Sequence, residues 1–541
     1  MRLANIALIA CLAIPAARAS QLTDAARDND AARVQQLIKA GADVNARGPD
    51  GGTALLWAAH FADADLVRAL LKAGADPSVA NLFGATPISE AAEVGSAAII
   101  EQLLKAGVDP NSTNPEGQQP LMVVARTGRT DAAEVLLRHG AEVDARESWG
   151  GQTALMWAAS QGHPAMIELL LKHHADANAH GVARNWQRRV TVEPRKKIMA
   201  DGGFTPLMYA ARENCIECVG VLLAGGADID DVDPDRVTSL NLALLNRHFD
   251  LAAALIEAGA DVNKWDFAGR TPLYNAIDMN TPPPNSTQPI ADKLTGLDIV
   301  DLLLARGADP NIQLKHRPEY RDGVYERGAD IMLSVGATPL MRAARSADVP
   351  VMKLLLAHGA MVELPNQYGV TPFMVAAGTG FGVRATRGTR ATEAMRIEAL
   401  QLLLEHGAEI NRRNLSQGRI EPAGEDNFLY RIRITYGNQR YIFSYVPPDG
   451  RIAMHGAAMN GWTEVVNFLA AHGSDIDTRG RDGKSALDLA AGNYEPEILV
   501  PPPDPFPETV AALEQLCEAR QGCAFAAPTV AEAGLADRNA R

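Results

Sequence analysis

The chain has 541 residues, of which 47% are hydrophobic but only 5% are aromatic, and its formal net charge at pH 7 is −14. This acidic balance argues against a nucleic-acid-binding protein, because binding to phosphate backbones requires a basic surface. The hydrophobic excess consists of Ala and Leu, which suits closely packed helices better than a core of large side chains.

The first residues, MRLANIALIACLAIPAARAS, have the pattern of an export signal. One positive charge at Arg2 precedes the apolar run 3–14, and a small-x-small cleavage motif follows it. We expect cleavage between Ala19 and Ser20, which would give a periplasmic or secreted protein. The alternative is a lipoprotein attached through Cys11, because Leu-Ile-Ala-Cys resembles a lipobox. No later stretch is apolar enough to predict a membrane span.

A segment that reads LIKAGADVNAR recurs along the rest of the chain. Its glycine appears at Gly41, Gly74, Gly107 and Gly140, with steps of 33 residues. The later copies have the marker residues His174, Gly226, Gly259, Gly307, Gly359, Gly407 and Gly473. A fixed period in this range is typical of a stacked-repeat protein, in which each unit contacts only its neighbours.

One copy shows how the repeat folds. In DGGFTPLMYAARENCIECVGVLLAGGAD, Thr205 is placed to cap a helix that begins at Pro206, where a missing amide hydrogen has no consequence. A turn near Asn214 leads to a second helix whose apolar residues face the first. Gly226 can adopt the left-handed conformation that ends this helix, and a turn-rich link follows. The sequence therefore predicts a helix-turn-helix unit and a hairpin-like loop.

The motifs TPLM, AA, LL and GAD at this spacing resemble those of the ankyrin repeat. The resemblance covers most of the chain outside its inserts, and it implies an all-α solenoid whose surface residues bind other proteins. Twelve units begin near Leu22, Gly48, Asn81, Asn114, Ser148, Asp201, Asp233, Asp266, Leu333, Asn366, Gly450 and Arg481.

The chain departs from this family at the position after Thr-Pro-Leu, where the family usually has His. Only His455 keeps it. Five other units have methionine there, namely Met122, Met156, Met208, Met341 and Met374. We expect thioether packing to take the place of the family's Thr-His hydrogen bonds in these units.

The regular spacing is interrupted in five places, and inserts in a repeat stack become loops that often lie on the binding face. Two interruptions, around 282–294 and 380–394, fall between the helices of units eight and ten. The predicted organisation is a signal peptide (1–19), repeats 1–5 (20–180), a basic insert (181–200), repeats 6–8 (201–311), an insert (312–332), repeats 9–10 (333–411), a β-hairpin insert (412–450), repeats 11–12 with a C-terminal capping helix (451–523) and a disordered tail (524–541).

The last insert contains FLYRIRITYGNQRYIFSYV, in which apolar and polar residues alternate on both sides of a Gly-Asn turn. A two-residue turn pairs Ile434 with Tyr441 and Ile432 with Phe443. The result is one β-hairpin with an aromatic face. Because an isolated hairpin is only marginally stable, this face either packs on the neighbouring repeats or binds a partner.

Four cysteines remain after removal of the predicted signal, and they form two close pairs. Cys215 and Cys218 form a CxxC motif near a helix start, where the helix dipole would lower a thiol pKa. The pair is either a core thiol with its neighbour, a static disulfide or a redox site. For Cys517 and Cys523 we expect a disulfide that holds the C-terminal helix.

The sequence predicts no metal, no cofactor and no catalytic residue. The acidic run from Asp228 to Asp235 fails as an EF-hand, because Arg236 stands where Gly is required and Leu242 where Glu is required. The histidines from His163 to His180 include no His-x-x-x-His pair with a supporting acid. GxSxG, HExxH and P-loop spacings are also absent from the sequence.

The ankyrin resemblance implies that partners contact the hairpin tips and the ends of the first helices. Aromatic residues and Arg, which contribute much of the binding energy in protein interfaces, occur there. The candidates are Phe83, Trp149, Phe204, Phe267 and Tyr368 at the tips, His60, Phe61, Arg126 and Arg212 beside the groove, and Arg188 and Arg189 in the basic insert. The alternatives are stacking between adjacent tips and, for the insert, a solvated loop.

The sequence thus predicts an exported, monomeric ankyrin-repeat scaffold or adaptor that is not an enzyme. It would bind another protein through its concave groove, hairpin tips and inserts, and neither nucleic acid nor a membrane span is expected. Two alternatives stay open. One is an accessory or regulatory protein of a periplasmic redox system that uses Cys215 and Cys218, and the other is a secreted effector that binds a host protein.

Overall fold

The computed structural model describes residues 21–189, 196–281, 292–315, 333, 335–380, 391–415, 432–436, 439–443, 450–493 and 505–520. Its residues divide into two compact units, Met1–Ala243 (unit 1) and Leu244–Arg541 (unit 2). The predicted signal peptide with its cleavage site, the lipobox Cys11, Cys523 and the C-terminal tail all lie outside the described residues. Each unit is described by itself.

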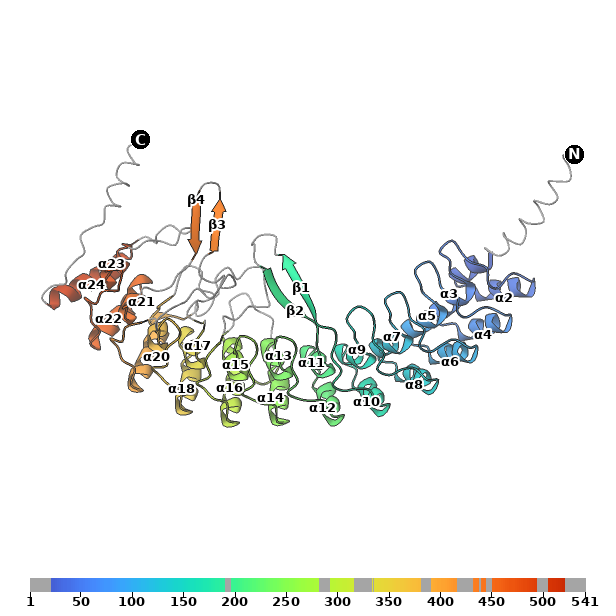
Figure 1. Cartoon of the computed structure of the whole chain (residues 1–541), viewed down its shortest axis with the longest axis horizontal. Coiled ribbons are helices and arrows are strands. Elements are labelled where there is room, and N and C mark those ends of the chain that lie inside the picture. The colour runs from blue at the N-terminus through green and yellow to red at the C-terminus, as the bar shows by residue number, and fades with distance from the viewer. Residues whose placement is uncertain are drawn as a thin grey trace, which may run out of the picture. The chain divides into compact units, whose positions relative to one another are not determined.

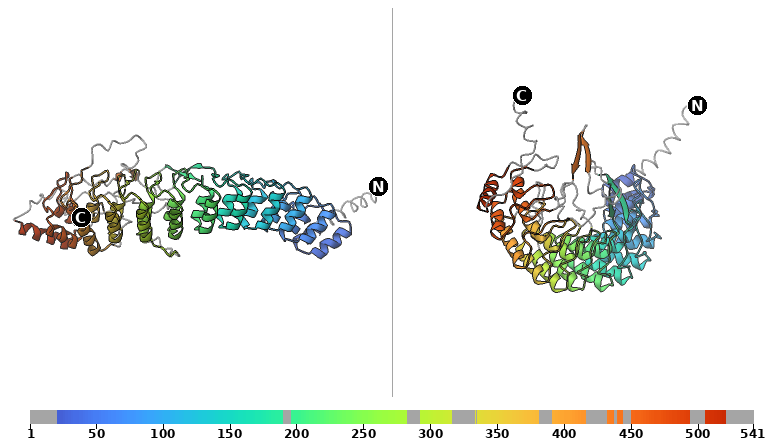
Figure 2. Two further views of the ribbon diagram at one scale, coloured as in Figure 1. Left: turned by 90° about the horizontal axis from the view of Figure 1, so that it is seen from below. Right: turned by 60° about the vertical axis from the view of Figure 1, so that its left-hand side comes forward.

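Unit 1 is a stack of helix pairs that follow one another in chain order (Figures 1 and 2). After the helical residues 21–27, the first helices of the pairs are α3 (Ala54–His60), α5 (Pro87–Glu93), α7 (Pro120–Thr127), α9 (Ala154–Ser160) and α11 (Pro206–Arg212). The second helices are α2 (Ala31–Lys39), α4 (Ala64–Lys72), α6 (Ala97–Lys105), α8 (Thr130–Arg138), α10 (Pro164–Lys172) and α12 (Ile216–Ala224). From α3 onward each first helix contacts the next first helix, and each second helix contacts the next second helix, so two helical layers result.

Unit 2 repeats this arrangement and ends in an additional helix. Its first helices are α15 (Pro272–Asn280), α17 (Pro339–Arg345), α19 (Pro372–Ala376), α21 (Ala453–Met459) and α23 (Ala486–Ala490). Its second helices are α14 (Phe249–Glu257), α16 (Gly296–Ala305), α18 (Val349–Ala357), α20 (Glu393–Glu405) and α22 (Thr463–Ala471), while α13 (Ser239–Leu245) spans the boundary between the units. The helix α24 (Pro507–Ala519) packs against α22 and α23 at the C-terminal end of the stack.

The helices begin and end where the sequence predicts. The Oγ1 atom of Thr205 accepts a hydrogen bond from the backbone N–H of Met208 at 3.3 Å, and Pro206 is the first residue of α11. Gly226 follows α12 with a φ of 91°, the left-handed conformation that favours glycine. His174 takes the same place after α10 with a φ of 65°, so the turn is kept even where a side chain opposes it.

The core of each unit consists of small and medium-sized apolar side chains. Paired alanines in the first helices, such as Ala58 with Ala59 and Ala158 with Ala159, are at most 1% exposed, so neighbouring helices approach closely. The methionines at the position that usually holds His are 0–2% exposed, and these are Met122, Met156, Met208, Met341 and Met374. This confirms the prediction that thioethers pack there.

The described residues include two antiparallel strand pairs, whereas the sequence predicts one. In the predicted hairpin, β3 (Ile432–Tyr436) pairs with β4 (Gln439–Phe443) in the expected register, with Ile434 opposite Tyr441. The packing of its aromatic face stays a prediction. The second pair, β1 (Arg184–Arg189) and β2 (Lys196–Asp201), lies in the basic insert, which we expected to be a loop. The strand RNWQRR lacks the apolar alternation on which strand prediction depends.

Among the described residues, no helix combines the length and apolar character that crossing a membrane requires.

Candidate functional site

The seventh residue of each first helix in unit 1 forms one row along the stack, which we call the helix-end row. The row consists of His60, Glu93, Arg126, Ser160 and Arg212. The side chains of His60, Glu93 and Arg212 are 47%, 49% and 44% exposed. These residues lie at the C-terminal ends of their helices, directly after the pair of small residues that packs in the core, and they point to a different side of the helix.

An aromatic cluster lies at the start of this row, at the end of α3. The ring of His60 lies edge-on to both Trp57 and Phe61, with centroid distances of 5.6 and 5.1 Å, and Trp57 stacks with Phe61 at 6.2 Å. A ring nitrogen of His60 lies 2.9 Å from a carboxylate oxygen of Glu90 on α5. Contacts of this kind fix ring orientations, so the cluster offers a preformed and partly exposed aromatic surface.

Two arginines of the row lie against aromatic rings. The guanidinium of Arg126 is 5.6 Å from the ring centroid of Trp157, and its Nη2 lies 2.5 and 2.6 Å from the two carboxylate oxygens of Glu93. The guanidinium of Arg212 lies 5.1 Å from the ring centroid of Tyr209. A cationic side chain that an aromatic face or a carboxylate already holds in place loses less conformational entropy when it binds a ligand.

The hairpin tips of unit 1 display large apolar side chains on a fixed backbone. Phe83 is 78% exposed, and the Oδ1 atom of Asn81 accepts hydrogen bonds from the backbone N–H groups of Phe83 and Ala85 at 3.0 and 2.9 Å. Trp149 is 67% exposed, and the carboxylate of Glu147 accepts the N–H groups of Trp149, Gly150 and Gln152. These tips therefore present aromatic side chains without needing to be ordered by a partner.

The other predicted tip residues divide into exposed and buried groups. Phe267 in unit 2 is 59% exposed. Phe204 packs against the buried cluster of Met208, Val237 and Leu242 and lies 5.5 Å from the ring centroid of Tyr209, so it stacks within unit 1.

The prediction that Tyr368 faces a partner is wrong, because this residue is only 4% exposed. Its N–H donates to Asn366 Oδ1 at 2.9 Å, as that of Phe83 does to Asn81, so the two tips share a local conformation and differ in burial. Burial of the aromatic ring stabilises this tip, but the same local conformation leaves Phe83 exposed, so the difference arises from the surroundings of each tip. The strand β1 contains Arg188 and Arg189, whose side chains are not among those described.

In unit 2 the equivalent positions of two first helices, α15 and α17, are buried instead. Asp278 and Arg345 are the seventh residues of α15 and α17, and they are 3% and 0% exposed. Arg342, also 0% exposed, donates from Nε to Asp278 Oδ1 and from Nη1 to Ser346 Oγ, both at 2.5 Å. Its Nη2 also reaches the backbone carbonyls of Asp278 and Thr281, at 3.3 and 3.1 Å.

A third buried arginine extends this polar interior. Arg345 donates to the carbonyls of Thr379 and Gly380, and Arg396 on α20 lies 4.0 Å from the ring centroid of Trp462. Burial, reinforced by the positive charge of Arg345, lowers the pKa of Arg396 to about 9. Sequence reasoning missed this cluster. The available signal was the motif TPLMRAAR, in which arginine occupies the fourth and seventh positions of a first helix.

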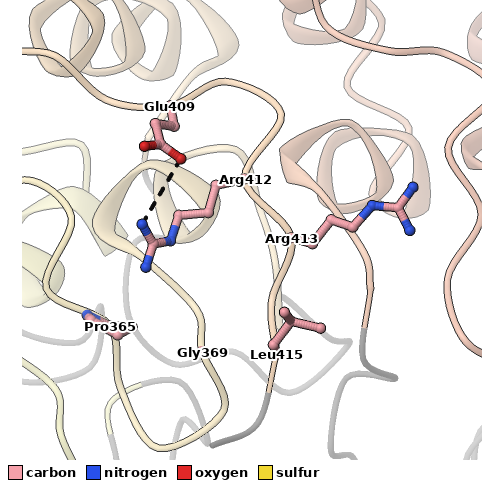
Figure 3. A pocket seen from close by; sticks show the side chains of 6 residues that line it. All are labelled: Pro365, Gly369, Glu409, Arg412, Arg413 and Leu415. Atoms are coloured by element: carbon pink, nitrogen blue, oxygen red, sulfur yellow. Dashed lines mark ion pairs between the residues drawn. The ribbon is translucent and has the colours of Figure 1, made fainter.

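A shallow depression of about 400 Å³ lies between two hairpin tips of unit 2 (Figure 3). Pro365, Gly369, Glu409, Arg412, Arg413 and Leu415 line it. Arg412 lies 3.0 Å from Glu363 and 3.9 Å from Glu409, whereas Arg413 points away from Glu409 (Figure 3). Burial raises the pKa of Glu363.

The acidic run and the histidines make ordinary loop contacts. Asp228 Oδ1 accepts the N–H of Asp230 at 2.9 Å, and Asp231 Oδ2 lies 2.8 Å from His180 Nε2. In the part of the chain that the structure describes, no three His, Cys, Asp or Glu side chains are grouped to hold a metal ion.

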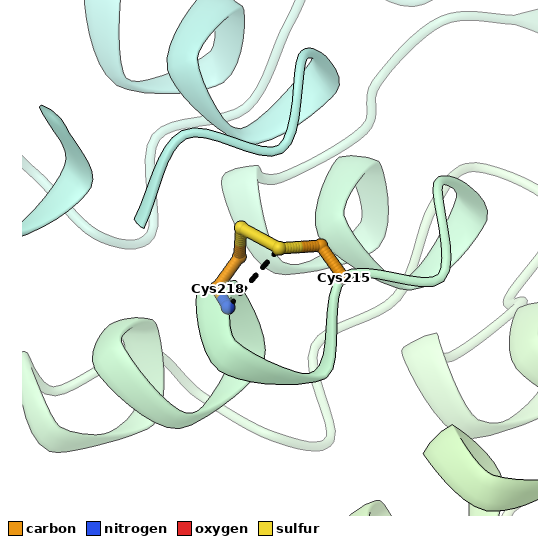
Figure 4. Close-up of a disulfide and its surroundings, with 2 residues drawn as sticks. All are labelled: Cys215 and Cys218. Carbon is orange, nitrogen blue, oxygen red and sulfur yellow. Dashed lines mark hydrogen bonds between the residues drawn. A yellow bond between two sulfur atoms is a disulfide. The ribbon is translucent and has the colours of Figure 1, made fainter. Parts of the chain in front are cut away.

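Cys215 and Cys218 lie together at the N-terminus of α12, with their Sγ atoms within bonding distance (Figure 4). Cys215 is the N-cap residue and is partly exposed, whereas Cys218 is 0% exposed and occupies the same core position as Met166 in α10. Of the other predicted pair, Cys517 is 3% exposed on α24, and Cys523 lies outside the described residues.

The family profile described as Ankyrin repeats (3 copies) matches residues 22–114, 88–180, 207–314 and 290–414, together more than half of the chain. The chain belongs to the ankyrin repeat family. Ankyrin repeats are in general scaffolds for interactions between proteins. The helix-end row and the tips of this ankyrin array are thus candidates for such an interaction.

Three relatives illustrate the breadth of this ankyrin similarity. The chain is 29% identical over 182 residues to YahD of Escherichia coli (strain K12), named as an ankyrin repeat protein, covering 32% of this chain and 89% of YahD. It is 34% identical over 199 residues to the B-cell lymphoma 3 protein homolog of Mus musculus, covering 33% and 42%. It is 29% identical over 195 residues to ankyrin repeat and SOCS box protein 16 of Mus musculus, covering 32% and 39%. The chain therefore spans less than half of each mouse protein.

Proposed function

We propose that the chain is an exported, non-enzymatic ankyrin scaffold that acts as a monomer and binds another protein on unit 1. The observation that carries this proposal is the row of partly exposed aromatic and arginine side chains at the helix ends, with Phe83 and Trp149 exposed on the adjacent tips. Interface energy is concentrated in such residues. Because contacts within unit 1 hold the side chains of His60, Arg126 and Arg212, and hydrogen bonds hold the backbone of the tips, less entropy is lost on binding.

The helix ends of unit 1 suit this role better than those of α15 and α17 in unit 2, which are buried. The fourth and seventh residues of α17 are both arginines with 0% exposure, so they are not accessible to a partner. In unit 1 the seventh residues of α3, α5 and α11 are exposed by 44–49%. The helix-end row and the hairpin tips of unit 1 are therefore the proposed contact region.

The binding proposal predicts that Phe83→Ala and Trp149→Ala each weaken partner binding by roughly 30-fold, the effect of removing an interface anchor worth about 2 kcal/mol. The measurement is affinity capture from a cell-envelope extract of the producing organism, followed by titration of the captured protein against each variant. Met395→Ala is the matched control, because Met395 is 42% exposed on α20, a second helix of unit 2.

Two deletions separate the tips from the inserts in the same experiment. Versions that lack 181–200 or 412–450 should capture the same protein if the helix-end row and tips are the binding surface. If either deletion removes the captured protein and the two tip variants do not, the inserts are the recognition surface and the proposal for the helix-end row and tips is wrong.

The export proposal predicts a mature protein that begins at Ser20. Intact-mass measurement of the protein from fractionated producing cells tests this, with periplasm and culture medium assayed separately. A soluble mature form in the periplasm, unchanged by Cys11→Ala, supports the scaffold. Accumulation in the medium favours the effector alternative, and a lipid-bearing Cys11 would contradict cleavage after Ala19.

A further inference from the structure

Cys215 occupies a position that carries aspartate in other repeats. The N-cap residues of α2 and α4 are Asp30 and Asp63, and each accepts the backbone N–H three residues later at 2.9 Å. At α12 the Sγ atom of Cys215 accepts the N–H of Cys218 at 3.2 Å. A thiolate at this N-cap would therefore meet the same backbone donor and the same helix dipole that stabilise the aspartates capping α2 and α4.

The surroundings leave space over the sulfur of Cys215. In neighbouring repeats the N-cap side chain covers the turn glycine of the preceding repeat. If that glycine carried a Cβ atom, the Cβ would lie 2.5 Å from Arg129 at Gly95 and 2.8 Å from His163 at Gly128. At the next turn a Cβ on Gly162 would be 3.9 Å from Cys215 Sγ. The short cysteine side chain thus covers this glycine less closely than Arg129 and His163 cover theirs, and Cys215 is partly exposed, whereas Cys218 is completely buried.

The two positions can form or release a disulfide without moving the helix. Their Cα atoms are 5.2 Å apart, within the usual range for a disulfide. When the pair is reduced, Cys215 keeps a backbone donor and Cys218 occupies a core position that accepts a small apolar side chain. Glu213 and Glu217 flank the site, although Glu213 pairs with Arg212 at 2.7 Å, and their charges oppose thiolate formation in part.

We propose that Cys215 and Cys218 form a thiol–disulfide exchange site that acts on aliphatic disulfides. The Cys215 thiolate attacks one sulfur of a substrate R–S–S–R, a new Cys215–S–S–R bond forms, and R–S⁻ leaves and takes up a proton. Cys218 then loses its proton and attacks Cys215 Sγ, which forms the Cys215–Cys218 disulfide and releases the second R–S⁻. Two electrons pass from the dithiol to the substrate. The exchange is stoichiometric, with one substrate disulfide reduced per dithiol, so it goes beyond the non-enzymatic scaffold function and does not depend on it.

Oxidised glutathione is the probe for this exchange. The full chain is reduced, desalted and treated with the probe under native conditions, then quenched by alkylation and mapped by peptide mass. The expected result is a transient glutathione adduct on Cys215, which precedes the internal disulfide. Cys218→Ala should trap that adduct, and Cys215→Ala should slow the reaction of Cys218 by roughly tenfold or more, because only a buried thiol remains.

Cys215→Asp is the matched control, because it restores the carboxylate cap of α2 and α4 and removes the exchanging sulfur. It should leave the thermal midpoint close to that of the reduced protein and abolish the adduct. If Cys218→Ala fails to fold, the order of adduct and disulfide in the unmodified chain decides. Equal reaction of both cysteines, or reaction only after denaturation, would overturn the proposal and leave a static structural pair.

Discussion

Replacing Asp278 with alanine is expected to lower the free energy of unfolding of unit 2 by about 3–5 kcal/mol. The carboxylate of Asp278 is 3% exposed and lies 2.5 Å from Nε of Arg342, which is 0% exposed. Without it the guanidinium would keep only neutral partners, namely a serine hydroxyl and backbone carbonyls. Urea unfolding followed by circular dichroism measures the loss, and hydrogen exchange of α15 and α17 peptides locates it, because repeat arrays can unfold in parts.

Two controls separate this effect from ordinary surface mutation. Asp301→Ala removes an exposed carboxylate from α16 and should change stability by about 0.5 kcal/mol or less. Combining Asp278→Ala with Arg342→Met should restore part of the stability, since no unpaired charge then stays buried. A single Asp278→Ala variant as stable as Asp301→Ala would show that Arg342 does not depend on this carboxylate.

The parts of the fold that the sequence predicts are those that local contacts determine. The cap of Thr205, the turn at Gly226 and the register of Ile434 with Tyr441 each depend on residues close together in the chain. Such contacts recur wherever the motif recurs, so the sequence of one repeat predicts the helices of the other repeats. The family assignment follows from the same regularity.

The parts that the sequence does not predict depend on contacts between distant residues. Phe83 and Tyr368 have the same Asn-x-aromatic tip and the same hydrogen bond, yet one is 78% exposed and the other 4%. Arginine at a helix end is exposed at Arg212 and buried at Arg345, again in closely similar motifs. The exposure of a side chain is thus set by the residues that pack beside its repeat, and the sequence of a single repeat does not include those residues. The sequence could therefore predict which positions belong to the candidate partner surface, but it could not predict which of those side chains are exposed.

A second large effect concerns pH, and it arises at His455, the one position that keeps the histidine of the family pattern. The ring is 2% exposed, Nδ1 accepts the N–H of Ile452 at 3.2 Å, and Nε2–H donates to the carbonyl of Lys484 at 3.3 Å. Burial, with a smaller contribution from the charge of Arg451, lowers the pKa of His455 from 6.5 to about 4. The neutral ring is therefore the form that the native structure holds.

Because the unfolded chain binds this proton more tightly than the native chain, the stabilisation by His455 is complete above pH 6.5 and is lost as pH falls toward 4. The expected loss between pH 7 and pH 5 is about 2 kcal/mol, by the conversion of 1.36 kcal/mol per pKa unit. Urea midpoints measured across this range test it. His455→Gln, which keeps a donor and an acceptor but does not titrate, should flatten that part of the profile, whereas the exposed His472→Gln should not. Identical profiles for His455→Gln and the unmodified chain would assign the acid sensitivity of unit 2 to its carboxylates instead, because those groups also gain protons as the pH falls.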